Sequence, residues 1–305
     1  MGLTAGIVGL PNVGKSTLFN AITRQNILAA NYPFATIEPN VGMVTVPDYR
    51  VDFLEKLYNP KKTIPATFEF TDIAGLVAGA SKGEGLGNKF LSHIREVDAI
   101  AEVVRCFDDS NITHVTGSVD PIRDVEIIGI ELILADLEIV ETRISKIGRK
   151  TKLSNDKEAK AELALLEKIQ ATLLDNKPAR SLVLTEDEEK IIKPFNLLTL
   201  KPIIYVANVD ENEINDENKY VKVLREFADA ENSKVVVVCA KIEAELSELS
   251  EEDKKLFLEE LGIKESGLDQ LIKKSYNLLG LETFLTGGPD EVRAWTFKKG
   301  MKAPQ

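Results

Sequence analysis

The stretch GLPNVGKST at residues 9–17 constrains this chain more than any other feature, because it directly follows the apolar run 4–8. It matches the phosphate-loop pattern G-x-x-x-x-G-K-[ST], in which glycines let backbone N–H groups turn toward phosphate oxygens. The helix that follows points the positive end of its dipole at the same anion. The pattern assigns Lys15 to the β- and γ-phosphates and Ser16 to Mg²⁺. We therefore expect nucleotide contacts from Asn12, Val13, Gly14, Lys15, Ser16 and Thr17, with Lys15 also counted as catalytic.

A carboxylate at the end of a second apolar run supports this prediction. Asp72, in FEFTDIAG, ends the run 67–71, where it can hold Mg²⁺ through water. Gly75 offers an N–H that can sense the γ-phosphate, although the pattern DxxG is common in turns. Thr36 lies in the long loop before the run 41–46, where it can close over the metal. The predicted Mg²⁺ ligands are Ser16, Thr36 and Asp72.

The purine is expected at VANVDE, where a third apolar run ends. GTPases have N-K-x-D at this place, and the Asp accepts hydrogen bonds from guanine N1–H and the 2-amino group. Val209 here replaces the Lys and Glu211 replaces the Asp, whose longer side chain cannot occupy the same position. Adenine has neither donor, so the altered motif weakens the case for GTP and permits ATP. Predicted contacts are Asn208 near the purine N7, backbone groups of Val209 at the adenine edge, Glu211, and the CAK residues Ala240 and Lys241.

Apolar runs of strand length alternate with helical patterns, which predicts an α/β fold with a mainly parallel sheet covered on both faces. The clearest runs are residues 4–8, 41–46, 67–71, 100–104, 203–207 and 235–238. The second run follows a long loop and is expected to pair antiparallel at an edge.

A helical insertion interrupts this alternation at residues 125–200. Ile133, Leu137, Val140, Ile144 and Ile147 repeat at intervals of four and three, which predicts a seam for packing another helix. A second helix carries Leu163, Leu166, Ile169 and Leu173, so we expect an antiparallel coiled-coil hairpin; two ordinary surface helices are the alternative. The nucleotide-binding domain is then predicted at 1–124 and 201–278, and the start of a small β-rich domain at 279–305.

Composition narrows the partners. The formal net charge is -11, which disfavours binding of DNA or RNA over the whole surface, although a local basic patch can still bind RNA. The two cysteines have no metal-ligand spacing and fit a reducing compartment. No apolar run reaches the about 18 residues of a membrane span. We expect a cytoplasmic protein without a membrane partner.

The catalytic group is the least defined part of the site. Many GTPases orient the attacking water with a Gln directly after DxxG, but this position is Leu76, which cannot hydrogen-bond water. His114, in DDSNITHVTG, is the best internal candidate, because a neutral imidazole can hold water; a plain solvent-facing loop residue is the alternative. Gly75 and Leu76 open a glycine-rich stretch that predicts a switch, although an ordinary flexible loop has the same composition. Asn12 can help to hold K⁺, but we favour a role in stabilising the loop.

Several stretches together resemble the Obg-like ATPases of the YchF subfamily, which are P-loop NTPases related to Obg. They are GLPNVGKST, NYPFATIEPN, TDIAGLVAGASKGEGLGNKFLSHIREVDAI, VVRCF and the altered NVDE, and the resemblance covers essentially the whole chain. It implies a nucleotide-binding domain with a coiled-coil hairpin, a C-terminal TGS domain of the β-grasp type, and Mg²⁺-dependent ATP hydrolysis with GTP as a poorer substrate. It also implies association with ribosomes and stress responses. Family members usually continue for several tens of residues, so we expect only the start of the TGS domain here.

Three functions stay open on the sequence. The first is an ATP-hydrolysing switch acting on the ribosome, through ribosomal RNA and proteins. The second is a GTP-specific Obg-type GTPase, and the third is a nucleotide-gated binding module with negligible hydrolysis, which Leu76 favours. Basic residues gather at the predicted hairpin turn and near the end, where they can contact RNA phosphates or simply form a solvated face: Arg143, Lys146, Arg149, Lys150, Lys152, Lys298, Lys299 and Lys302.

Overall fold

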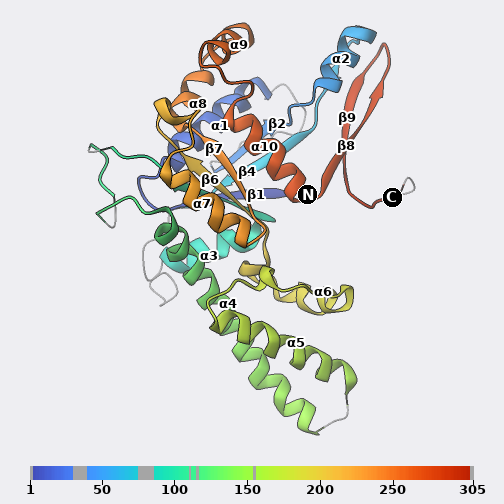
Figure 1. Ribbon diagram of the computed structural model, residues 1–305. Coiled ribbons are helices and arrows are strands. Elements are labelled where there is room, and N and C mark those ends of the chain that lie inside the picture. Colours follow the sequence, from blue (N-terminus) through green and yellow to red (C-terminus); the bar gives the residue numbers. More distant parts are fainter. Residues whose placement is uncertain are drawn as a thin grey trace.

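A six-stranded sheet forms the centre of the molecule in a computed structural model, which describes residues 3–29, 40–74, 86–109, 111–114, 117–153 and 156–302. The strand order is β2-β4-β1-β5-β6-β7 (Figure 1). The strands are β1 (Thr4–Gly9), β2 (Val41–Thr45), β4 (Thr67–Asp72), β5 (Ala99–Arg105), β6 (Ile203–Asn208) and β7 (Lys234–Val238). They confirm all six predicted runs. All pairs are parallel except β2 with β4, so the antiparallel edge strand is also confirmed.

Helices cover both faces of this sheet. Every residue of β5 and of β6 is buried, and because successive strand residues point to opposite faces, both faces must be covered. The phosphate-binding elements therefore rest on a fully buried centre. The helices around the sheet are α1 (Lys15–Ala29), α3 (Leu86–Glu96), α7 (Lys219–Ala230), α8 (Ala240–Leu246), α9 (Glu251–Glu260) and α10 (Gly267–Leu278), with the 3-10 turn η5 (Glu211–Glu213).

A helical hairpin extends away from the sheet (Figure 1). It consists of α4 (Pro121–Leu153) and α5 (Lys157–Leu174). The Asp120 side chain accepts a hydrogen bond from the Arg123 N–H at 3.2 Å and so caps the start of α4. Val140, Leu166 and Ile169 are fully buried in a hydrophobic cluster separate from the sheet core, as the seam predicted. The chain returns through η2 (Ala179–Ser181), α6 (Glu186–Ile192), η3 (Lys193–Phe195) and η4 (Leu198–Leu200).

A buried carboxylate attaches this return segment to α4. The Asp136 side chain accepts from the Leu198 N–H at 2.9 Å and from both the N–H and the hydroxyl of Thr199 at 2.7 and 2.6 Å. Burial raises the pKa of Asp136, while these three donors act in the opposite direction.

The domain boundaries at residues 125, 200 and 279 stay predictions.

A three-stranded sheet, β3-β9-β8, lies beside α2 (Tyr49–Tyr58) (Figure 1). The antiparallel strands β8 (Leu281–Gly287) and β9 (Val292–Lys298) confirm a β-rich end of the chain. The sequence did not reveal β3 (Thr63–Ile64), which pairs parallel with β9. A two-residue strand is too short to carry a periodic pattern.

Two sequence expectations concern the chain as a whole. Cys106 and Cys239 are free and buried. Within the described residues, none of the helices has the length and apolar character needed to cross a membrane.

Candidate nucleotide-binding site

The phosphate loop connects β1 to α1, and its backbone has the conformations that the motif requires. Asn12 and Gly14 both have positive φ, 65° and 94°, in the region that favours glycine and asparagine. A Cβ atom on Gly14 would lie 2.2 Å from the Asn208 side chain. Only glycine fits here, because both the dihedral angle and the close neighbour exclude a side chain.

The two charged residues expected at the phosphates lie together. The Lys15 ammonium group forms a short ion pair with the Asp72 carboxylate, although 57 positions separate them. Lys15 begins α1 and Asp72 ends β4, so adjacent strands β1 and β4 bring the two residues to the same edge. Ser16 and Thr17 are exposed in the first turn of α1. The structure thus brings Lys15 and Asp72 together, and Ser16 follows Lys15 in the first turn of α1.

The donor set at this place fits Mg²⁺ only in part. The Ser16 hydroxyl and the Asp72 carboxylate are oxygen ligands of the kind Mg²⁺ prefers. Among the residues described, no group of three or more His, Cys, Asp or Glu side chains is arranged to hold a metal ion. Phosphate oxygens and water would have to complete the coordination, as they do in phosphate-loop sites.

Asn208 braces the phosphate loop against the base-binding side. Its side chain is buried; the amide nitrogen donates to the Val13 carbonyl at 2.8 Å, and the amide oxygen accepts from the Ala240 N–H at 2.9 Å. We expected this side chain to bond the purine N7 region. Its oxygen and one amide hydrogen connect the loop to the start of α8. The amide nitrogen carries a second hydrogen, and its contact with the purine N7 stays a prediction.

The other base-side residues also have protein partners. The Val209 N–H donates to the Val238 carbonyl at 2.9 Å, which leaves the Val209 carbonyl as the group that can accept from an adenine amino group. The Glu211 carboxylate pairs with the Lys241 ammonium group at 2.7 Å, and both side chains are largely exposed. Lys241 therefore pairs with Glu211, the residue at the position where GTPases have the Asp that binds guanine.

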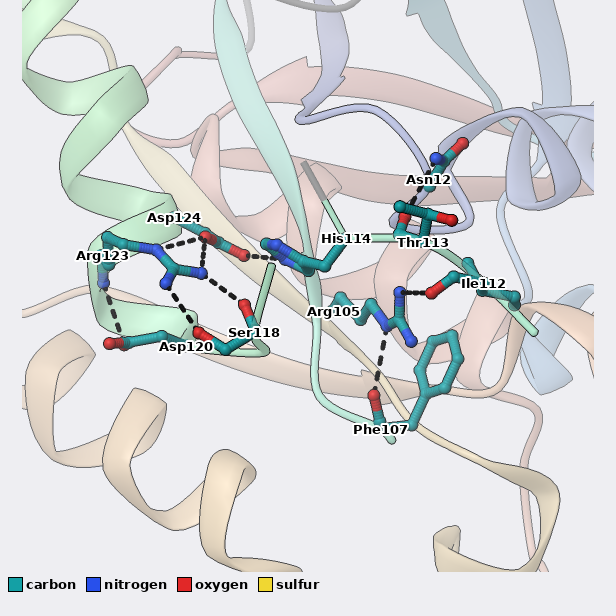
Figure 2. Close-up of polar contacts among 10 residues, drawn as sticks. All are labelled: Asn12, Arg105, Phe107, Ile112, Thr113, His114, Ser118, Asp120, Arg123 and Asp124. Atoms are coloured by element: carbon teal, nitrogen blue, oxygen red, sulfur yellow. Dashed lines mark hydrogen bonds and ion pairs between the residues drawn. The ribbon is translucent and has the colours of Figure 1, made fainter. Parts of the chain in front are cut away.

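A buried arginine shapes the loop after β5 (Figure 2). Arg105 is 2% exposed and donates to three backbone carbonyls, those of Phe107, Asp109 and Ile112, at 3.2, 3.1 and 2.9 Å. The next carbonyl, that of Thr113, accepts from the Asn12 amide at 3.1 Å. This contact agrees with a loop-stabilising role for Asn12. Arg105 was not predicted as a functional residue, because its only signal is a charge at the end of an apolar run.

His114 is not a solvent-facing loop residue. It is buried, and its Nε2 lies 2.8 Å from the Asp124 carboxylate, which is itself buried in the first turn of α4. Arg123 donates to the other oxygen of Asp124. Figure 2 shows the imidazole directed at Asp124 and away from Asn12. In this conformation His114 does not face the phosphate loop.

Three sequence expectations lie outside the described residues. They are the predicted metal ligand Thr36 and the predicted switch residues Gly75 and Leu76.

Comparisons with known proteins show which family this chain resembles. A family model described as 50S ribosome-binding GTPase matches residues 4–143. The protein named Ribosome-binding ATPase YchF from Bacillus subtilis is 63% identical over all of this chain and 84% of its own length. The protein of the same name from Escherichia coli O157:H7 is 52% identical with the same coverage.

A solved structure agrees over the whole chain as well. The structure titled as the Schizosaccharomyces pombe YchF GTPase has a TM-score of 0.89 and 43% identity, and the match covers 100% of this chain and 82% of that one. These identities and shares are high enough to assign the family. This chain belongs to the YchF family of P-loop NTPases.

Proposed function

We propose that this protein is a Mg²⁺-dependent P-loop NTPase that prefers ATP to GTP and acts on the ribosome. The name of its bacterial relatives, Ribosome-binding ATPase YchF, supports ATP as the nucleotide and the ribosome as the partner. The fission-yeast structure is titled a GTPase, so the choice of nucleotide needs its own argument. The observation that carries it is the ion pair between Glu211 and Lys241.

Guanine specificity depends on a carboxylate that can accept two hydrogen bonds from the base. Glu211 stands at that position with an extra methylene and is paired with Lys241 at 2.7 Å. To read guanine it would have to leave this partner and shift. Val209, where the motif has Lys, is 3% exposed and packs in the sheet core. Adenine loses nothing from these changes, since it lacks both donors.

Lys15, Ser16 and Asp72 would hold the phosphates and the metal. Mg²⁺ held there would supply positive charge that neutralises the phosphates. Lys15 would exchange its Asp72 partner for phosphate, which frees the carboxylate to bind metal-coordinated water. Thr36, Gly75 and Leu76 keep their predicted roles in this proposal. Potassium also stays a prediction; the Asn12 side-chain oxygen would be its ligand, because the amide nitrogen donates to Thr113.

His114 is the proposed group that positions water. Its neighbour Thr113 contacts Asn12 in the phosphate loop, so the segment is adjacent to the site. Since the ring now pairs with Asp124, hydrolysis requires the His114 side chain to turn toward the phosphates. The same observation favours the second candidate, a nucleotide-gated binding module that scarcely hydrolyses, for as long as Asp124 retains the ring.

Ribosome contact is proposed through RNA phosphates at the basic end of the hairpin. Arg143 is paired with Glu162 of α5 at 2.9 Å, whereas Lys146 and Arg149 are exposed. Lys298 and Lys299 add exposed positive charge at the end of β9. A role in stress responses and a cytoplasmic location stay predictions from the resemblance.

The test is to restore the guanine-reading motif. The double variant Val209→Lys with Glu211→Asp should lower the KM for GTP and raise that for ATP in a steady-state hydrolysis assay with ribosomes present. Glu245→Asp, at an exposed position of α8, is the matched control and should change neither value. Unchanged nucleotide preference in a folded double variant would refute the argument. Turnover absent with and without ribosomes would favour the binding module.

A further inference from the structure

A cavity of about 470 Å³ lies away from the nucleotide site, where the hairpin joins the sheet. Its walls come from α4, α7, strands β5 and β6, and the return segment 176–181. None of the described phosphate-loop residues lines it. Val125, Ile133 and Phe227 contribute apolar surface, and charged side chains lie among them. A space with these walls suits a small molecule with an apolar body and a polar group.

Glu102 is the unusual residue in this cavity. It lies in the middle of β5 and is 2% exposed, yet no hydrogen bond joins its carboxyl group to any residue that the structure describes. Its polar neighbours are occupied elsewhere, because Tyr205 and Arg180 both donate to Glu231, at 3.1 and 2.8 Å. The Arg180 Nε is also buried without a partner in the described part of the chain. Buried polar groups are normally hydrogen-bonded, so the Arg180 Nε needs an explanation, and the Glu102 carboxyl group lines the same cavity.

The charges around Glu102 favour a cation. Burial raises the pKa of Glu102 well above its usual range; Arg180 opposes this shift, and the carboxylates of Glu231 and Asp124 add to it. Glu126 and Lys177 face the same cavity and cancel each other in charge. With Glu102 ionised, the side chains that line the cavity carry one negative charge more than positive charges, because Glu231 pairs with Arg180 and Glu126 offsets Lys177. A bound cation would balance this excess of negative charge.

We propose that this cavity binds a small organic cation with an apolar body, whose charged group pairs with the Glu102 carboxylate. The apolar walls take the body of the ligand, and Arg180 Nε offers a donor to any acceptor atom beside the charge. Binding ionises Glu102, and its proton leaves to solvent. The site is distinct from the nucleotide site and does not depend on the proposed ATPase activity.

The probe is benzamidine, whose planar amidinium group can pair with a carboxylate through two hydrogen bonds. Benzamide is the neutral molecule of the same shape, and benzoate is the anionic one. Calorimetric titration of the full chain should show saturable benzamidine binding at one site and at least about tenfold weaker binding of benzamide and benzoate. Affinity for benzamidine should rise with pH, since Glu102 must lose a proton to bind it.

Two variants locate the site. Glu102→Gln should weaken benzamidine binding by about tenfold or more, whereas Glu226→Gln, at an exposed position of α7, should leave it unchanged. Gly129→Leu tests the cavity without touching the charge, because the Gly129 Cβ position has no neighbour within 4 Å and lines the cavity. This variant should also abolish binding. The proposal is overturned if wild-type protein does not bind benzamidine, if benzamide or benzoate binds as tightly, or if Gly129→Leu binds normally.

Discussion

Replacing Asn208 with Ala should destabilise the protein and weaken nucleotide binding together. The buried side chain satisfies two backbone groups, the Val13 carbonyl at 2.8 Å and the Ala240 N–H at 2.9 Å. Each buried group left without a partner costs roughly 1–3 kcal/mol, so Asn208→Ala should lower the free energy of unfolding by about 2–6 kcal/mol. ATP affinity should fall as well, because the phosphate loop loses its attachment to α8.

Urea unfolding with and without ATP measures both effects. Asn215→Ala is the matched control, since this exposed side chain makes one hydrogen bond, to the Leu261 carbonyl at 2.8 Å. Its loss should cost less than about 1 kcal/mol and should not change ATP affinity. If the two variants unfolded at the same urea concentration and bound ATP equally well, Asn208 would not brace the loop.

Substitutions at Gly14 and Glu243 give two further predictions. Gly14→Ala would place a methyl group 2.2 Å from the Asn208 amide at a φ of 94°, so titration should show that ATP binding is lost. Gly148→Ala is the control, because its Cβ position has no neighbour within 4 Å; it should raise the free energy of unfolding by about 1 kcal/mol through helix propensity. Equal ATP binding by both variants would count against the loop geometry. Burial raises the pKa of Glu243 from 4.5 to about 7, so the folded protein favours the neutral carboxyl and its stability falls as pH rises from 4.5 through about 7. Glu243→Gln keeps the acceptor for the Gly267 N–H, so its free energy of unfolding should increase relative to that of the wild type by on the order of 3 kcal/mol between pH 5 and pH 8. A difference between the two proteins that stays constant across this range would contradict the assignment.

Much of the fold follows from short-range patterns. The strands β5 and β6 are mainly apolar because both faces are buried, with Glu102 and Arg105 as the charged exceptions in β5. The seam of α4 repeats at the helical period. The pairing of β3 with β9 has no such pattern, because it joins Thr63 to Val292 across most of the chain. Contacts of this kind depend on tertiary packing, which a local window does not contain.

Some features of the candidate site could likewise be predicted from local motifs, and others could not. The motif around Lys15 and the Asp at the end of β4 predicted their proximity, since parallel strands place their carboxyl ends at one edge. The direction of His114 depends on Asp124, which belongs to another element and has no motif. The motif placed Asn208 at the base, but it did not reveal that this side chain also bonds the Val13 carbonyl and the Ala240 N–H. Side-chain partners across elements are what the sequence does not encode locally.

The central claim is that this phosphate loop takes a purine triphosphate and that the altered base motif favours adenine. Calorimetric titration of the full chain with ATP and with GTP, each with Mg²⁺, tests it most directly. The account predicts saturable binding of one ATP, tighter than GTP by at least about tenfold, or about 1.4 kcal/mol. Equal or tighter binding of GTP would contradict the reading of Glu211, and no saturable binding of either nucleotide would contradict the site itself.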